Sequence, residues 1–186
     1  SYEIPIYMED SSVMLLLKMG NGFIYHDYAS VSLIEYALEN IAEEVFSDEF
    51  HIWHGKGPHD YLVFIVKLKN HVEHELEQTR NFEQERKKRL SESAFVFKDY
   101  VSNYLKGQIE MLITDWFDFP QGVSSAYRSG LSRFFQGARA EKDHIRFLSD
   151  QELKPLTTKS IESLYKPPTL IHLLESNQWD GAELKI

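Results

Sequence analysis

The feature that most constrains this chain is a seven-residue run, Val13 to Met19 (VMLLLKM), in which every residue except Lys18 is apolar. A strand with one face in water alternates apolar and polar side chains, whereas a strand covered on both faces does not. Gly20-Asn21-Gly22 follows directly and supplies a turn. The run therefore predicts a strand at the centre of a sheet, with other elements packed on both of its faces.

The next segments predict a helix, a hairpin and a long helix. Ser32 and Glu35 form an S-x-x-E capping box, and the apolar stripe behind it ends near residues 47–48. Residues 51–54 and 61–68 flank the turn sequence GKGPHD, which predicts an antiparallel hairpin. No Gly or Pro interrupts residues 71–105, so we expect one helix there. Its first half is polar and is expected to project into solvent or to touch a partner.

The second half of the chain repeats the alternation of strands and helices. Residues 108–114 predict a strand whose Ile109, Met111 and Ile113 point inward, after a helix stop at Gly107. Residues 115–122 (DWFDFPQG) are expected to form a loop, and residues 144–148 an edge strand. Another helix lies between them, and its apolar stripe consists of Val123, Tyr127, Leu131 and Phe134 or Phe135. The expected order of elements is βαββαβαβ, which is an α+β domain.

We divide the chain into an N-terminal linker (1–12), this domain (13–150) and a C-terminal helical connector (151–186). In the connector, Pro167-Pro168 opens a helix that carries Leu170, Leu173 and Leu174. Because the sequence begins without Met and ends within a polar helical pattern, we expect it to be a piece of a longer protein.

Charge and composition exclude several classes of protein. Twenty Lys and Arg against 29 Asp and Glu give a formal net charge of −9, which disfavours direct nucleic-acid binding. The densest basic run, Arg86 to Arg89, follows Glu83 and Glu85 at the spacing of helix ion pairs and predicts a solvated helix face. The chain has no Cys and hence no disulfides. Its apolar runs are far shorter than the ~20 residues that span a bilayer, so no membrane anchor is expected.

The order of elements and the hairpin string GPHDYLVFI (residues 57–65) resemble the GGDEF fold of diguanylate cyclases. The resemblance implies a nucleotide-cyclase-like, ferredoxin-like fold, with helices packed on a mixed, mainly antiparallel sheet. In that family the turn reads Gly-Gly-Asp/Glu-Glu-Phe. Here Gly57, Asp60 and Tyr61 stand at the first, fourth and fifth places, and Pro-His occupies the second and third.

This chain departs from the family pattern at the positions that bind metal ions for catalysis. Cyclisation of GTP needs two hard cations held by carboxylate oxygens. The family takes one carboxylate from the third hairpin residue, which is His59 here, and another from the end of the first strand, where this chain has Lys18. An ammonium group repels Mg²⁺. The family's inhibitory product site would fall on Asp48 and His51 and is missing as well. We therefore predict no catalytic residues, no enzyme activity and no cofactor, and keep an active nucleotide cyclase only as a remote alternative.

Residues 101–131 and 153–185 are also similar to the middle region of AraC-type response regulators of the YesN kind. In those proteins a receiver domain precedes such a module and an AraC-type helix-turn-helix domain follows it. The resemblance implies a cytoplasmic, bacterial two-component transcription regulator in which this chain is a non-catalytic coupling domain. Its partners would be the receiver and DNA-binding domains of the same protein, and a second copy if the polar helix from Val72 to Arg89 mediates dimerisation.

Three groups of residues are candidate sites. Lys18, Gly57, His59 and Asp60 would line the vestigial nucleotide cleft, and the alternative function is to sense a small anionic ligand there. Trp116, Phe117 and Phe119 either contact a neighbouring domain or cap the core beside the sheet. Histidines crowd the hairpin, but His51 and His54 are expected on opposite faces of their strand, and we predict no metal site.

Overall fold

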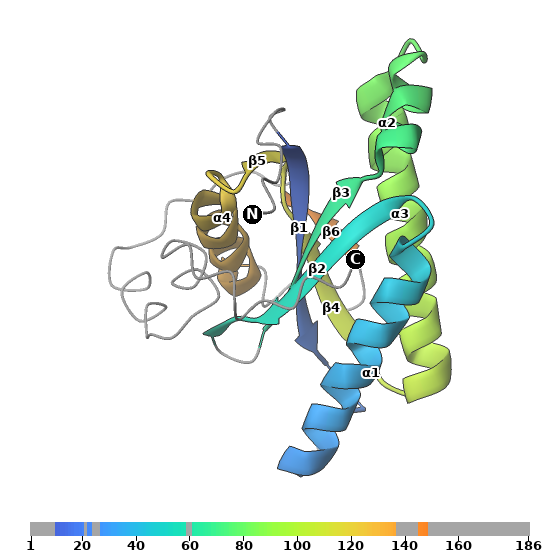
Figure 1. The fold of residues 1–186 in the computed structure, drawn as a ribbon. Coiled ribbons are helices and arrows are strands. Elements are labelled where there is room, and N and C mark those ends of the chain that lie inside the picture. Colours follow the sequence, from blue (N-terminus) through green and yellow to red (C-terminus); the bar gives the residue numbers. More distant parts are fainter. Residues whose placement is uncertain (1–9, 21, 24–26, 59–60, 137–144, 149–186) are drawn as a thin grey trace, which may run out of the picture.

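The computed structural model describes residues 10–20, 22–23, 27–58, 61–136 and 145–148. In these residues the chain forms one mixed sheet of six strands with four α-helices (Figure 1). The expected α+β class is confirmed. The connector predicted for residues 151–186 and linker residues 1–9 lie outside the described residues.

Strand β1 (Asp10–Met19) lies in the middle of the sheet, as its sequence predicts. β3 (Leu62–Leu68) and β4 (Ile109–Ile113) pair with it on either side, both antiparallel. β2 (Phe50–Lys56) and β6 (Ile145–Phe147) complete the order β2-β3-β1-β4-β6. Among the strands of the described residues, only β6 runs parallel to its neighbour, so the sheet is mixed and mainly antiparallel, as predicted.

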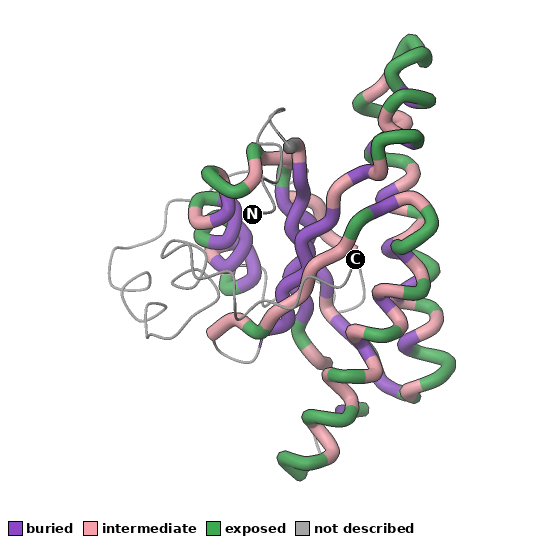
Figure 2. The backbone as a smooth tube through the Cα atoms, in the orientation of Figure 1, coloured by how far each residue is buried: buried purple, intermediate pink, exposed green. Residues whose placement is uncertain are grey.

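Successive residues of β1 enter two different hydrophobic cores, which is why the strand shows no polar alternation. Val13, Leu15 and Leu17 belong to the core beneath the helices α1 (Tyr28–Phe46), α2 (Asn70–Glu77) and α3 (Phe82–Tyr100). Met14 and Leu16 belong to the core beneath α4 (Val123–Gln136). The two helical layers lie on opposite faces of the sheet, and the buried residues concentrate between them (Figure 1, Figure 2).

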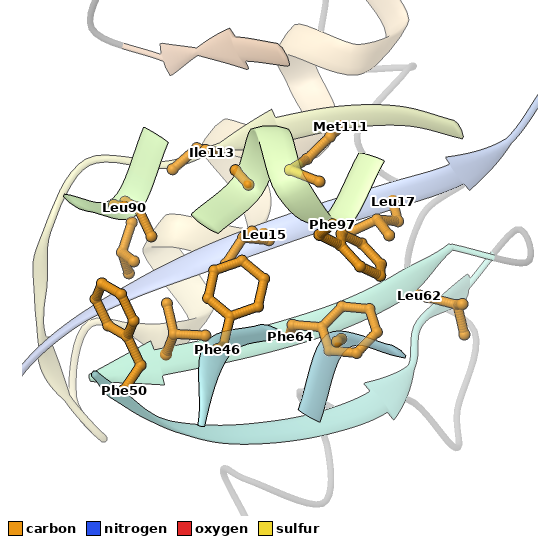
Figure 3. Close-up of a cluster of buried hydrophobic side chains, with 14 of the residues drawn as sticks. Leu15, Leu17, Phe46, Phe50, Leu62, Phe64, Leu90, Phe97, Met111 and Ile113 are labelled. Carbon is orange, nitrogen blue, oxygen red and sulfur yellow. The ribbon is translucent and has the colours of Figure 1, made fainter. Parts of the chain in front are cut away.

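Phenylalanines fill the larger core and tie its helices to the sheet (Figure 3). The ring of Phe46 on α1 lies edge-on to Phe50 on β2 and to Phe97 on α3, with centroid separations of 5.9 and 6.1 Å. Phe64 on β3 meets Phe97 in the same way at 6.2 Å. Each such fully buried side chain contributes about 1.5–3 kcal/mol relative to an exposed one, so this cluster fixes the position of α1 and α3 on the sheet.

Helix α1 begins before the capping box that the sequence suggests. Its N-cap is Asp27, whose Oδ1 accepts a hydrogen bond from the backbone N–H of Ser30 at 2.8 Å. Ser32 lies inside the helix and donates to the carbonyl oxygen of Tyr28, while Glu35 forms an ion pair with Lys56 of β2. The capping-box prediction was therefore wrong, because Glu35 is engaged with the sheet rather than with a helix terminus.

The single helix predicted for residues 71–105 is also wrong. The backbone N–H and the hydroxyl of Thr79 both donate to the carbonyl of Leu76 and end α2, and α3 starts after a turn. Arg89 of α3 reaches back to Glu75 of α2 at 2.7 Å, so the two helices form a hairpin. The hairpin extends beyond the sheet, as expected for a polar segment (Figure 1). However, its inner side contributes Val72 and Leu76 to the core.

The basic run on α3 is only partly a solvated face. Lys87 and Lys88 are exposed, but Arg86 is buried, with 6% of its surface accessible. The ion pairs differ from the predicted i,i+4 set, since Glu83 pairs with Arg86 and Arg89 pairs with Glu49 and Glu75.

The turn between α3 and β4 does not have the helix stop that the sequence predicts at Gly107. A π-helical turn, η2 (Val101–Leu105), follows α3, and Lys106 rather than Gly107 adopts the left-handed conformation, with φ of 56°. Gly107 is required for packing instead, because a Cβ there would lie 2.1 Å from the ring of Phe23. Ile109, Met111 and Ile113 face the larger core, as predicted.

The segment predicted to be a loop contains a short strand. β5 (Phe117–Phe119) pairs with residues 10–12 of β1, so these residues belong to the sheet and the predicted linker boundary at residue 12 is wrong. α4 follows with the predicted stripe, in which Phe134 rather than Phe135 is buried. No helix in the described part of the chain is long and apolar enough to cross a membrane.

Candidate functional site

Lys18 lies at the end of β1, on the face of the sheet that α4 covers. Side chains alternate along a strand, so Lys18 shares this face with Met14 and Leu16. Its Cα lies opposite Glu110 of β4, and the preceding residue lies opposite Leu62 at the start of β3. Residues 12–17 are all buried, whereas Lys18 is exposed. This end of the sheet therefore carries a solvent-accessible cation next to buried apolar residues of the same strand.

Two further polar residues gather at this end of the sheet. Arg146 of β6 pairs in register with Leu112, which places it on the same face. Its Nη2 lies 3.8 Å from Oε2 of Glu110, and its Cζ lies 5.1 Å from the centroid of the Phe134 ring. The other terminal nitrogen, Nη1, is buried and makes no hydrogen bond within the described residues. A buried guanidinium N–H without an acceptor is costly, and an anion is the group that satisfies it best.

Tyr61, directly before the second hairpin strand, lies on the same side of the sheet as Glu110 and Arg146. Its ring is buried against Phe134, with centroids 5.2 Å apart. Burial raises the pKa of Tyr61 above 10, Glu110 raises it further, and Arg146 opposes both effects. The hydroxyl is therefore protonated at neutral pH and available as a hydrogen-bond donor.

Gly57 lies beside Tyr61, and its N–H donates to the Tyr61 carbonyl at 2.7 Å across the hairpin end. A Cβ at this position would lie 2.6 Å from the hydroxyl oxygen of Tyr127, a buried residue of α4. The glycine is therefore explained by the close approach of α4 to the hairpin.

Two of the four residues predicted to line the cleft lie in the described part of the chain. Lys18 and Gly57 lie at the same end of three adjacent strands, whereas His59 and Asp60 lie outside the described residues. Glu110 and Arg146 are not among the site residues that the sequence predicts, and Tyr61 is predicted only as part of the hairpin pattern. Glu110 could have been noticed, because it alternates with the apolar Ile109 and Met111 and so lies on the other face of β4. Its pairing with Lys18 depends on a strand register that no local pattern specifies.

This arrangement suits an anion and does not suit a divalent cation. The guanidinium of Arg146 lies 3.8 Å from the carboxylate of Glu110, and a second cation, Lys18, stands opposite Glu110 in the strand register. Mg²⁺ requires several oxygen ligands and would be repelled by both cations. A phosphate or carboxylate group, in contrast, is a matching ligand for a guanidinium and an ammonium.

The aromatic residues after β4 cap the two cores. Trp116 packs on the larger core, while Phe117 and Phe119 pack on the smaller one. Phe119 stacks on Trp53 of β2, with ring centroids 5.9 Å apart and an interplanar angle of 5°. All three are half-buried, and these contacts are the ones that the capping alternative predicts.

The histidines of the hairpin lie on opposite faces, as predicted. His54 faces α1, where its ring nitrogens lie 3.3 Å from Glu39 and 3.4 Å from Glu43. His51 lies beside Trp53, which packs on the opposite core. Over the described ranges, no three His, Asp or Glu side chains are grouped so that they could hold a metal ion.

Known proteins give no independent guide to this site. No family model matches the chain, and no curated protein or solved structure matches it.

Proposed function

We propose that this chain is a non-catalytic regulatory domain with a degenerate, GGDEF-like fold. Its elements β1-α1-β2-β3-α3-β4 follow the order of the ferredoxin-like motif on which the resemblance to cyclases is based, and this order supports the proposal. The observation that carries it is Lys18, an exposed cation at the end of the central strand, where a cyclase requires a metal-binding carboxylate.

The proposed setting is a cytoplasmic two-component transcription regulator of the AraC type. The domain would stand between a receiver and a helix-turn-helix domain and transmit the phosphorylation state of the first to the second. The formal charge of −9 supports a role that does not include direct contact with DNA.

The catalytic part is tested by incubating the chain with GTP and Mg²⁺ or Mn²⁺ and separating the nucleotides. We expect GTP to remain intact. Formation of a cyclic or dinucleotide product by the chain would overturn the proposal.

The coupling part is tested in the full-length regulator, with beryllofluoride as the phosphoryl mimic. Operator binding should tighten on activation, and replacing residues 13–150 by a flexible Gly/Ser linker should abolish this response. An unchanged response in the linker variant would show that the domain transmits nothing.

A second candidate function is the sensing of a small anion at the sheet end, and the buried Nη1 of Arg146 favours it. A ligand that binds only the folded state raises the melting temperature, by an amount equivalent to about 2.7 kcal/mol at 100 times its Kd. Pyrophosphate, nucleotides and sugar phosphates are suitable probes. Lys18→Ala should abolish the rise, and Lys88→Ala, a charge-matched change on exposed α3, should not. Equal responses in both variants would mean unspecific anion binding.

A further inference from the structure

Strand β2 forms one edge of the sheet and is the outermost strand below β3 in Figure 3, where it carries Phe50. Within the described residues β2 pairs only with β3, so one row of its backbone N–H and C=O groups faces away from the sheet. The strand runs for seven residues without proline, and Phe50 is its only buried residue. An edge of this kind is a template for pairing with another strand. β2 is therefore a candidate docking surface.

The register of the hairpin identifies the backbone groups that face outward. The N–H of Lys69 donates to the carbonyl of Glu49 at 2.9 Å, in register with the pairing of β2 and β3. In an antiparallel ladder, pairs of residues that exchange hydrogen bonds alternate with pairs that do not. The odd-numbered residues of β2 therefore bond to β3. The N–H and C=O groups of Ile52 and His54 point away from β3, toward the open side of the sheet.

The charged and titratable side chains of β2 are all basic. They are His51, His54 and Lys56, and the strand contains no acidic residue. On the face that α1 covers, His54 and Lys56 lie against carboxylates of that helix. On the opposite face, His51 stands beside Lys67, its partner in the strand register. The two faces of this edge therefore differ in charge.

Further positive charges surround His51, whose side chain is exposed. Partial burial is the largest cause of its lowered pKa, and the charges that contribute next are all positive. They belong to Lys69, Lys67 and His71. We call these three residues and His51 the basic patch. Because the chain as a whole has a formal charge of −9, the basic patch is a local reversal of its charge and attracts acidic groups.

We infer that β2 binds an extended acidic segment of a partner protein, which adds to the sheet as a further strand. An extended backbone presents N–H and C=O groups that match those of Ile52 and His54. Side chains alternate along such a strand, so acidic residues on one of its faces lie against the basic patch. A second copy of β2 is a poorer match, because that strand holds no carboxylate.

Fluorescence anisotropy with a labelled heptapeptide of sequence TEVEVET is the first measurement. Binding to β2 needs neither a receiver nor DNA, so the 186-residue chain is used alone and the result is separate from that of the coupling experiment. The acidic peptide should bind reversibly. A lysine counterpart, TKVKVKT, should bind at least about tenfold more weakly because its charges are repelled. No binding of the acidic peptide, or equal binding of both, overturns the inference.

A fully N-methylated form of the acidic peptide separates strand addition from simple attraction of charge. It keeps the carboxylates but has no N–H groups to donate to β2, so it should bind at least about tenfold more weakly. Amide hydrogen exchange in the wild-type chain gives the location. The N–H groups of Ile52 and His54 should exchange at least about tenfold more slowly at saturating acidic peptide, because they gain acceptors. Binding without this protection would overturn strand addition at β2.

Reversal of the basic patch tests the source of the affinity. His51→Glu with Lys67→Glu should weaken binding of the acidic peptide at least about tenfold. The matched control, His74→Glu with Lys88→Glu, makes the same two replacements at exposed positions of α2 and α3 and should change the Kd by less than about threefold. Equal weakening in both variants would show an effect of net charge alone and would overturn the inference.

Discussion

The guanidinium carbon of Arg86 lies 3.8 Å from the centroid of the Trp116 ring, and its Nη1 donates to the hydroxyl of Ser11 at 3.0 Å. These contacts join three segments that are distant in the sequence: α3, the start of β1, and the link between β4 and β5. A residue from the most basic run of the chain thus serves as a buried connection between the helical layer and the sheet.

Replacing Arg86 by Lys should lower the free energy of unfolding by about 1–2 kcal/mol. Lysine keeps the charge but cannot stack its flat face on Trp116 while donating to Ser11. Urea denaturation measures the change. The control is Lys88→Ala on an exposed turn of the same helix, which should stay within about 0.5 kcal/mol of wild type. If the two variants unfold together, Arg86 does not connect the layers.

The contrast between β1 and Arg86 shows what the sequence could predict. The burial of Val13 to Leu17 on both faces follows from a local pattern, because continuous apolarity requires cover on both sides. The burial of Arg86 depends on Trp116, which lies 30 positions away in the sequence. The local pattern of charges predicts only an exposed helix surface, so it cannot predict this burial. The same limit applies to the candidate site. Lys18 could be selected from the sequence, but Glu110, its partner in the strand register, and Arg146, which pairs with Glu110, come from other strands.

A second prediction concerns the N-cap of α1, which is Asp27 in the structure, whereas the sequence pattern indicates Ser32. Asp27→Ala should cost about 1 kcal/mol, within a usual range of about 0.5–2 kcal/mol, because the N–H of Ser30 loses its acceptor. Ser32→Ala should be neutral or slightly stabilising, since Ser32 lies inside the helix, where alanine is the better residue. Thermal unfolding of both variants gives the comparison. A larger loss for Ser32→Ala would restore the original capping-box assignment.

A third prediction concerns the reason for a glycine at position 57. Substitution of Gly57 tests whether the glycine is required by packing against α4 or by the binding of a nucleotide. Gly57→Ala places a methyl group 2.6 Å from the Tyr127 hydroxyl, so α4 or the hairpin must shift. Overpacking of this kind typically costs about 1–3 kcal/mol. The same change in a Tyr127→Phe background should cost less, because the clashing oxygen is gone. A double-mutant cycle of unfolding free energies that shows no coupling would exclude the packing explanation.

The pH dependence of stability should include a contribution from His51. Partial burial of an otherwise exposed ring, then the charges of Lys69, Lys67 and His71, hold the pKa of His51 below 6.5. Between the folded and unfolded pKa values the unfolded chain binds more protons, so stability rises with pH there and falls as the pH drops below 6.5. His51→Gln should flatten this slope, and Lys67→Gln should give an intermediate one because it removes one of the repelling charges. Urea midpoints measured from mildly acidic to neutral pH provide the test, with Lys88→Gln as a remote lysine control. If His51→Gln retains the wild-type slope, the loss of stability in acid arises elsewhere in the chain.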